Sequence, residues 1–584
     1  MQRRTVVKTL GSMAAAGFAP RLSWAAAPVP EFFFDQLGYV PGGRKAVTVR
    51  GALGSNAEFR IRSVHEARVV FSGKLGEEQR DEASGDLVRD ALFSSLIQPG
   101  EYFVEVAGGH SLPVRIAPDV YGQALRTTMR AFHGQRCGFA VDLGGGYQHP
   151  ACHLQGMFHS SSGKSGTLPQ SGGWHDAGDY GRYVVNSGIT CGTLLWAWEM
   201  FPSSLRNLSL DIPRGKLGLP DFLEEVKWNL NWMMSLQDDD GGVFHKQTSL
   251  HFCAFIMPEK DTLPSQVIGT GVKPYKSTCA TADLAAVFAI AARCFREFDK
   301  SLAANYLAAA RRAWAWAVSN PDVTFRNPPG VDTGEYGDAH CDDELLWASA
   351  ELWRTTGEPQ FLERFVQVVP EAGVTVGTPG WGNLRSMALW TYALADRGDT
   401  HGLRDRIVAG TLAAAAEFSK RSVACGYGNT LSTADYGWGS NSNAANQSLL
   451  LVMANRFRPD AALVDCALEN LHYLFGRNCH GVSWVTGLGT KPFLHPHHRP
   501  SAADGVEAPW PGLLSGGPNR RPADAAAKTL PAMPPMRMWI DDQRAYSMNE
   551  VAINWNAPLV LLLAFAHQLG VEGGSRSGTV DASR

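Results

Sequence analysis

The chain has 584 residues, 45% of them hydrophobic and 19% charged, so it holds enough apolar material for a large core and is not disordered throughout. Lys and Arg total 53 and Asp and Glu total 56, which gives a formal net charge of −3. This lack of a basic excess argues against nucleic acid or an anionic membrane as the main partner. The 17 Trp residues are a high count, and clefts that bind carbohydrate use such aromatic surface.

Residues 1–27 are predicted to be an export signal. Arg3, Arg4 and Lys8 precede a short apolar stretch, and residues 25–27 are three alanines suited to cleavage. The paired arginines favour the twin-arginine route, with the general secretory route as the alternative. No later run reaches the ~18 uncharged apolar residues of a membrane span. We therefore expect an exported protein, periplasmic or secreted, that is a monomer without a membrane span.

Residues 29–117 are predicted to form a small β-sandwich. Short β-rich runs such as 45–49, 58–61 and 102–106 are separated by Gly and polar turns at intervals of roughly ten to twenty residues. The segment contains no Trp, and the run Phe32–Phe34 is interpreted as core or as an interface to the helices that follow. The sandwich is thus expected to support its neighbour and not to bind sugar.

From residue 119 to 570 the apolar pattern has a helical period. Helices are predicted at 119–136, 186–201, 221–237, 278–298, 301–318, 342–356, 359–369, 382–397, 402–421, 443–457, 460–475 and 550–568. Asp221 and Glu224 have the spacing of a capping box. Twelve helices in sequential pairs can close into a ring of six inner and six outer helices, with an open two-layer solenoid as the alternative. A short tail, 571–584, follows.

The densest polar cluster is the Gly-rich segment 171–181, which contains Asp176 and Asp179. Two carboxylates three residues apart can converge on one water molecule, so that one accepts its proton while the other orients it. A turn or a calcium loop is an equal alternative on spacing alone.

Two further clusters lie near the C-terminus. One is His495–Arg499, and the other runs from Asp541 through Tyr546 and Glu550 to Trp555. Glu550 is expected to begin the last helix beside apolar neighbours, which could raise its pKa and make it an acid. A Glu at a helix start can equally be a cap favoured by the helix dipole.

Together and in this order, the three clusters strongly resemble glycoside hydrolase family 9, whose well-known members are cellulases. Residues 483–491 extend the match upstream of the His cluster, and Phe34–Tyr39 resembles the start of the immunoglobulin-like domain that one branch carries. The resemblance implies a mainly α fold, an (α/α)6 barrel preceded by an immunoglobulin-like β-sandwich. It also implies an inverting mechanism.

The resemblance assigns a role to each matching residue. Asp179 is the implied general base, Asp176 helps to hold the water, and Glu550 protonates the leaving oxygen. His497 and Arg499 match positions that bind sugar hydroxyls, and Asp541 supports the site. The implied sugar-contacting aromatic residues are Trp555, Tyr546 and Trp438, although core packing is an equal reading for Trp438.

Cys137, Cys152, His153 and His175 are the types of residue that bind Zn²⁺ tetrahedrally, but their wide spacing is a weak signal. The immunoglobulin-bearing branch has a similar arrangement around a structural zinc. Since His175 directly precedes Asp176, such a metal would fix the catalytic loop.

A second metal set is oxygen-rich. Residues 333–338, followed by 342–344, resemble the family's calcium loop, with Thr333, Gly334, Asp343 and Glu344 as implied ligands. Hard oxygen ligands suit Ca²⁺. An acidic helix start favoured by the dipole is the alternative.

The sequence therefore predicts a secreted endo-β-1,4-glucanase that acts on β-glucan. An exo-acting β-glucosidase, cellodextrinase or glucosaminidase of the same family is the near alternative, because insertions at 156–166 and 501–529 could close one end of a cleft. A catalytically silent glycan-binding protein is the rival from another class, and intact Asp176, Asp179 and Glu550 argue against it.

Overall fold

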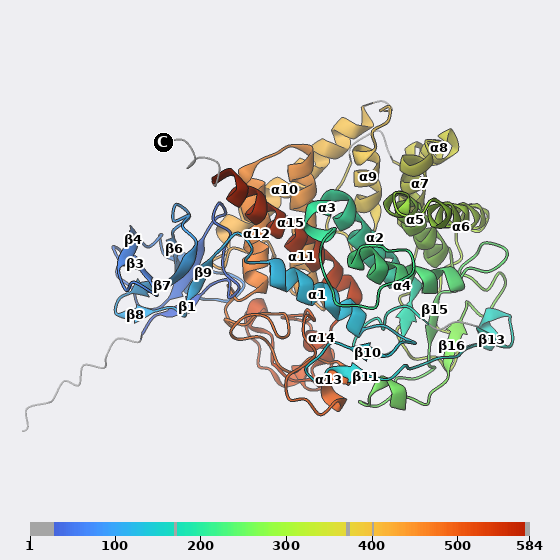
Figure 1. Cartoon of the computed structure of the whole chain (residues 1–584), viewed down its shortest axis with the longest axis horizontal. Helices are drawn as coiled ribbons and strands as arrows, with labels where there is room; N and C mark the ends of the chain where they lie inside the picture. Colours follow the sequence, from blue (N-terminus) through green and yellow to red (C-terminus); the bar gives the residue numbers. More distant parts are fainter. Residues whose placement is uncertain (1–28, 169–171, 370–373, 400–401, 578–584) are drawn as a thin grey trace, which may run out of the picture.

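The computed structural model describes residues 29–168, 172–369, 374–399 and 402–577, so the predicted export signal lies outside the described residues. Figure 1 shows a β-sandwich beside a larger helical body. Residues 31–116 form the sandwich, and the helices begin at residue 122.

The sandwich consists of two antiparallel sheets. One has the strand order β1-β2-β6-β5, and the other has the order β4-β3-β7-β8 with β9 also paired to β7. The strands are β1 (Glu31–Phe33), β2 (Ala46–Arg50), β3 (Glu58–Ser63), β4 (Val69–Lys74), β5 (Gln79–Arg80), β6 (Leu87–Leu92), β7 (Gly100–Val106), β8 (Gly109–His110) and β9 (Val114–Ile116). Alternate residues of β7, including Val104 and Val106, are buried, as the period of two in a half-buried strand requires.

The helical body is an (α/α)6 barrel. Six helices are buried on nearly every side: α2 (Val184–Met200), α5 (Thr278–Phe295), α7 (Asp342–Thr356), α9 (Arg385–Leu394), α11 (Ser440–Phe457) and α15 (Ile553–Ser577). The six outer helices are α1 (Gly122–Gly134), α4 (Asp221–Ser235), α6 (Lys300–Ser319), α8 (Pro359–Val368), α10 (Leu403–Ala424) and α12 (Ala461–Leu474). Helices α15, α2, α5, α7 and α9 contact one another in this order, and α11 contacts α15.

The close packing of the inner helices is clearest in α5, whose sequence is apolar and small on nearly all faces. In α5, seven alanines between Ala280 and Ala292 leave room for its neighbours. This is the one described helix long and apolar enough to cross a membrane, and 94% of its 18-residue window is buried inside the protein. Its hydrophobicity is therefore explained by its central place in the barrel.

All twelve predicted helices are present, and the ends of eleven lie within three residues of the prediction. The last, α15, continues to Ser577, nine residues beyond its predicted end and into the predicted tail. The predicted capping box is wrong, because Pro220 precedes α4 and Asp221 is its first residue. The Asp221 carboxylate instead accepts a hydrogen bond from the backbone N–H of Leu210 at 2.8 Å. Three short helices were not predicted: α3 (Pro202–Leu205), α13 (Arg499–Ala503) and α14 (Tyr546–Asn549).

A further sheet, also not predicted, lies within the barrel domain. Its strand order is β13-β12-β16-β15-β14, and its strands are β12 (Gly156–Phe158), β13 (Thr167–Leu168), β14 (Arg182–Tyr183), β15 (Lys246–Thr248) and β16 (Ser265–Ile268). A two-stranded ribbon, β10 (Val141–Asp142) and β11 (Gln148–His149), precedes it. The larger sheet matters for the site because β14 follows the Asp176–Asp179 loop directly and pairs with β15.

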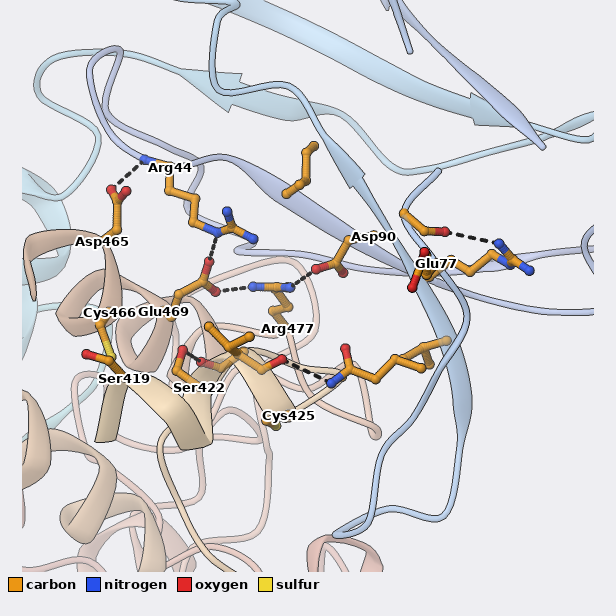
Figure 2. A pocket seen from close by; sticks show the side chains of 18 of the residues that line it. Arg44, Glu77, Asp90, Ser419, Ser422, Cys425, Asp465, Cys466, Glu469 and Arg477 are labelled. Atoms are coloured by element: carbon orange, nitrogen blue, oxygen red, sulfur yellow. Dashed lines mark hydrogen bonds and ion pairs between the residues drawn. The ribbon is translucent and has the colours of Figure 1, made fainter. Parts of the chain in front are cut away.

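The sandwich is docked firmly on the barrel. Phe33 lies in the apolar core of the barrel and meets the ring of Tyr427 edge to face, whereas Phe34 lies in the core of the sandwich. A cavity of about 550 Å³ lies between the domains, and Figure 2 shows Arg477 between Glu469 of α12 and Asp90 of β6. Arg477 is fully buried, and its ion pair with Asp90 measures 2.8 Å. Buried charges of this kind hold the domain orientation, because separating them would leave a charge unpaired.

Candidate active site

The loop that carries Asp176 and Asp179 approaches the His497 backbone so closely that only glycine fits at residue 178. A Cβ on Gly178 would lie 1.7 Å from the carbonyl oxygen of His497. The Gly178 carbonyl accepts a hydrogen bond from the backbone N–H of Arg499 at 3.0 Å. The glycine that the motif requires therefore joins the first polar cluster to the second.

The second cluster is joined to the third by main-chain pairing. The His497 N–H donates to the carbonyl of Asn549 at 2.8 Å, and His497 forms a parallel bridge with Glu550. Glu550 itself precedes α15, which begins at Ile553, so the expectation that it starts the last helix is wrong by three residues. The Ile553 N–H donates to the carbonyl of Asp176 at 2.9 Å. All three clusters thus meet in one site.

Asp176 is buried in a network of donors. Its Oδ2 accepts a hydrogen bond from the Tyr336 hydroxyl at 2.6 Å, and its Oδ1 accepts one from Asn186 Nδ2 at 2.6 Å. Burial raises the pKa of Asp176 to about 7, and these two donors oppose that rise. Asp179 is half-buried, and its Oδ2 accepts from the Gly181 N–H at 3.0 Å. Asp176 is therefore rigidly held, while Asp179 keeps access to solvent.

Glu550 lies among aromatic side chains. Its Oε2 accepts a hydrogen bond from Trp438 Nε1 at 2.9 Å, and the ring of Tyr546 lies 5.5 Å from that of Trp438. Burial, followed by the charge of Asp179, raises the pKa of Glu550 to about 8. A carboxyl group with such a pKa is protonated at neutral pH and can act as an acid.

The predicted residues around this centre take different roles. The Asp541 carboxylate accepts hydrogen bonds from the N–H groups of Leu494 and His495 at 2.9 and 2.8 Å, so it supports the chain that leads to His497. Burial lowers the pKa of His497, which shares a hydrogen bond with the Gln543 carbonyl at 2.8 Å through Nδ1. Trp438 is 48% exposed, so a simple core role for it is wrong.

Arg499 is buried, and its guanidinium contacts main-chain oxygen atoms. It donates to the carbonyl of Gly178 at 2.9 Å and to that of Cys253 at 3.0 and 3.1 Å. The ring of Phe255 stacks against this guanidinium at 5.1 Å. Arg499 thus links the loop that carries Asp176 and Asp179 to the segment around Cys253. Trp555, half-buried near the start of α15, packs against Gly439 and Gly516.

The four predicted zinc ligands come together. Ligand atoms of Cys137, Cys152, His153 and His175 all lie within 4.8 Å of one another. Cys152 Sγ lies 3.7 Å from His175 Nε2, close to the ~3.6 Å edge expected between sulfur and nitrogen on a tetrahedral zinc. His153 Nδ1 is buried without a hydrogen-bond partner, while its Nε2 faces Asp261 Oδ2 at 3.3 Å. An orienting carboxylate of this kind commonly accompanies a metal-bound His, so the set fits zinc.

The four predicted calcium ligands do not form one set. The carbonyl oxygens of Thr333 and Gly334 accept hydrogen bonds from Lys246 Nζ at 3.3 and 2.8 Å. The Lys246 side chain already binds these oxygens, so the structure gives no support for Thr333 and Gly334 as calcium ligands. Asp343 and Glu344 belong to a separate acidic group at the start of α7.

That acidic group includes Asp283 of α5, which the sequence did not indicate. Both carboxylate oxygens of Asp283 and Oε2 of Glu344 are buried without a hydrogen-bond partner. Burial first, and neighbouring carboxyl charges second, raise the pKa of both groups well above the usual range. A disulfide between Cys279 and Cys341, also not predicted, fixes the two helix starts beside them. Unpaired buried carboxylates of this kind fit a cation.

The comparisons with known proteins agree with this geometry. Residues 121–563 match the model for glycosyl hydrolase family 9, and residues 27–111 match that for the cellulase N-terminal immunoglobulin-like domain. The chain belongs to glycosyl hydrolase family 9. It is therefore a glycoside hydrolase of the cellulase family with the fold predicted from its motifs.

Several family 9 relatives span nearly the whole chain. Endoglucanase D of Acetivibrio thermocellus is 35% identical over 539 residues, which cover 91% of this chain and 82% of that protein. A xyloglucan-specific endo-β-1,4-glucanase of Bacteroides ovatus is 33% identical, with 92% and 94% covered. The crystal structure of a zinc-binding triple mutant of a family 9 endoglucanase superposes with a TM-score of 0.84 at 35% identity, covering 90% of this chain and 99% of that one.

Three residues of this family 9 site escaped prediction from the sequence: Asn186, Lys246 and Tyr336. Asn186 and Tyr336 contact Asp176 from α2 and from the loop after residue 333. Asn186 lies in no motif, and Tyr336 lies in segment 333–338, which the sequence assigned to calcium and not to Asp176. The rule that a buried carboxylate requires donors predicts that such residues exist, but not which ones they are.

Proposed function

We propose that this enzyme hydrolyses β-1,4-linked glucan with inversion of configuration. The observation that carries the proposal is the meeting of the Asp176–Asp179 loop with Glu550 through the backbone of His497. Asp179 is the proposed base, because it keeps solvent access, and Asp176 orients the water. Glu550 is the proposed acid, because its pKa of about 8 keeps it protonated at neutral pH.

In the proposed mechanism, water attacks the anomeric carbon from the side of Asp179 while Glu550 protonates the departing oxygen. An inverting pair is separated by ~6.5–9.5 Å, which leaves room for that water. Trp438 offers an exposed face beside Glu550, where a sugar ring can stack. The test is proton NMR of the first-formed sugar. We expect the inverted anomer, and retention would contradict a single displacement.

The proposed mode of attack is endo, on unbranched β-glucan. The relatives bear on this choice only by their names, which include endoglucanases, a xyloglucan-specific endoglucanase and a cellodextrinase. Product analysis on soluble cellulose, xyloglucan and short chromogenic glycosides separates the alternatives. A falling viscosity with mixed oligosaccharides supports endo action, whereas one small product from the outset supports the exo alternative. No turnover of any of them would favour a silent glycan-binding protein.

We further propose one structural zinc, held by Cys137, Cys152, His153 and His175. Four protein ligands close the coordination sphere, so the metal would supply stability and not a bound water. The His175 N–H donates to the carbonyl of Gln135 at 2.7 Å, and His175 precedes Asp176 directly. The zinc set therefore anchors the base side of the site.

We propose a calcium ion at the acidic group Asp283, Asp343 and Glu344, without Thr333 and Gly334. The unpaired buried oxygens of Asp283 and Glu344 support it. A divalent cation would neutralise charges that burial otherwise makes costly. Calorimetric titration of chelated protein with Ca²⁺ is the test, and Asp283→Asn should weaken the binding.

We also propose export by the twin-arginine route, which Arg3 and Arg4 support, and a monomeric state.

A further inference from the structure

Lys246 of β15 carries a fully buried amino group that faces four oxygen atoms, and burial lowers the pKa of this group to about 7. Its Nζ lies 2.7 Å from Asn327 Oδ1 and 2.8 Å from the Gly334 carbonyl. The hydroxyl and carbonyl oxygens of Thr333 lie at 3.1 and 3.3 Å. An ammonium has three N–H donors and no acceptor, so this oxygen cage can satisfy all of them. We call these four oxygens and the residues that supply them the Lys246 cage.

The Lys246 cage lies directly behind the catalytic loop. Tyr183, four residues after Asp179, is paired with Lys246 across β14 and β15, and its ring lies 5.5 Å from the ammonium. The same ring lies 4.7 Å from the ring of Tyr336. The cage is thus one layer of side chains away from the carboxylates.

One continuous segment leads from the cage to Asp176. Thr333 and Gly334 bind the ammonium, the carbonyl of Glu335 is bound by His245 Nε2 at 3.0 Å, and Tyr336 donates to Asp176. His245 directly precedes Lys246, the first residue of β15. Two adjacent side chains at the start of β15 therefore hold two adjacent peptides, and the next residue holds the carboxylate.

Lys246 and a metal ion are mutually exclusive in this cage. Calcium requires 6–8 oxygen ligands at ~2.3–2.6 Å and would have to displace the ammonium from the same carbonyls. A lysine carries its N–H donors on a covalent tether, so it fills the cage with a group that dilution or chelation cannot remove. The cage has the oxygen donors of a cation site, but the chain provides the cation itself.

We propose that Lys246 is a positioning residue for catalysis: its ammonium fixes segment 333–336 so that Tyr336 holds Asp176 in place to orient the attacking water. This inference rests on the proposed function, in which Asp176 orients the water. It assigns the cage a role in turnover beyond its contribution to folding.

The chain supplies a matched control in Lys45. This lysine is also fully buried, and its Nζ donates to the carbonyls of Pro41 and Gly43 at 2.6 and 2.9 Å, but it lies in the sandwich. Lys45→Met and Lys246→Met each leave buried carbonyls without their donor and should both lower Tm. Only Lys246→Met should lower kcat, by ~10–100-fold with KM little changed, as expected when a reacting group is misplaced by about 1 Å.

A double-mutant cycle tests whether Lys246 acts through Tyr336. Tyr336→Phe removes the hydroxyl that binds Asp176, and we expect a similar loss in kcat. If both belong to one pathway, the double variant should lose no more than the worse single variant. A loss equal to the product of the single losses, or a kcat for Lys246→Met within about twofold of wild type, would overturn the proposal.

One further variant and one further measurement make the result of the double-mutant cycle interpretable. Lys246→Gln retains N–H donors without the charge, and it replaces Lys246→Met in the cycle if the latter does not fold. Wild-type turnover of soluble cellulose is measured first, because its absence would refute the proposed function and not the cage. With that turnover established, additivity in the cycle refutes the role of Lys246 alone.

Discussion

The two sides of the active site hold their carboxyl groups in opposite ways. Asp176 receives donors at both oxygens and is backed by the zinc set and the Lys246 cage, whereas Glu550 receives a hydrogen bond from Trp438 in aromatic surroundings. Burial raises the pKa of Asp176 to about 7 and that of Glu550 to about 8. One side is a polar network that fixes the position of its carboxylate, and the other is a site beside Trp438 that keeps a proton on its carboxyl group. The sharpest tests break one side while leaving the other intact.

The largest effect is expected from the acid side. Glu550→Gln removes the proton donor, so kcat on unactivated glucan should fall by ~10²–10⁴-fold. A glycosyl fluoride has a leaving group that needs little protonation and should lose far less. Steady-state kinetics on both substrates provide the check, and an equal, small loss on both would remove Glu550 from the role of acid.

On the base side, Asp179→Asn should also lower kcat by ~10²–10⁴-fold, but on both substrates alike, because the attacking water then lacks its base whatever group departs. Substrate binding should remain, as measured by calorimetry with an unhydrolysed oligosaccharide. If Asp179→Asn loses activity only on the unactivated substrate, Asp179 is the acid and Glu550 is the base.

The support of Asp176 can be tested by removing the zinc ligands. Cys152→Ser combined with His153→Ala should abolish zinc binding, and elemental analysis after dialysis should fall from about one zinc per chain to none. Because His175 then loses its anchor beside Asp176, kcat should fall ~10-fold or more. Cys466→Ser, at a buried cysteine of α12, is the control and should keep its zinc. Zinc retained in the double variant would leave these residues as ordinary packing.

We expect the raised pKa of Glu550 to set an alkaline limit on activity. An acid works only while protonated, so kcat should be lost as pH rises through the pKa of Glu550, about 8. The Trp438 N–H favours the carboxylate form and lowers that pKa, so Trp438→Phe should move the limb upward by up to about one unit. Tyr546→Phe keeps this N–H and should leave the limb in place. A downward shift for Trp438→Phe would refute the contact.

The sequence predicted the catalytic side chains better than the residues that hold them in place. Asp176, Asp179 and Glu550 stand in ordered motifs, and the zinc set is made of Cys and His side chains whose chemistry is specific. Thr333 and Gly334 were assigned through backbone carbonyls, which every residue has, so nothing in their identity excluded a lysine as partner. Lys246 itself lies 87 residues before Thr333, on a three-residue strand too short to show a period.

The elements of the fold were also predicted unevenly. Long helices such as α5 and α6 were predicted almost to their ends because many apolar positions repeat in each. The sheet formed by β12–β16 was missed because strands of two to four residues show no alternation. The start of α15 was placed three residues early, because its periodic pattern continues backwards through Val551 and Ala552.

The smallest expected effect concerns stability, and it separates the two sides most directly. The pKa of Glu550 in the folded protein exceeds its ordinary value, so the folded state binds this proton more tightly, and stability falls as pH rises from about 4.5 to about 8. Glu550→Gln removes that loss and should raise Tm by of the order of 1–2 °C at pH 8 and hardly at pH 4.5. The exposed Glu507→Gln is the control.

Asp176→Asn should not gain stability in the same way, although the pKa of Asp176 is also raised. Asn186 and Tyr336 require two acceptor oxygens, and an amide offers one. Calorimetric scans at both pH values decide the point, since a comparable gain for Asp176→Asn would show that its donors contribute little and that the two sides are alike.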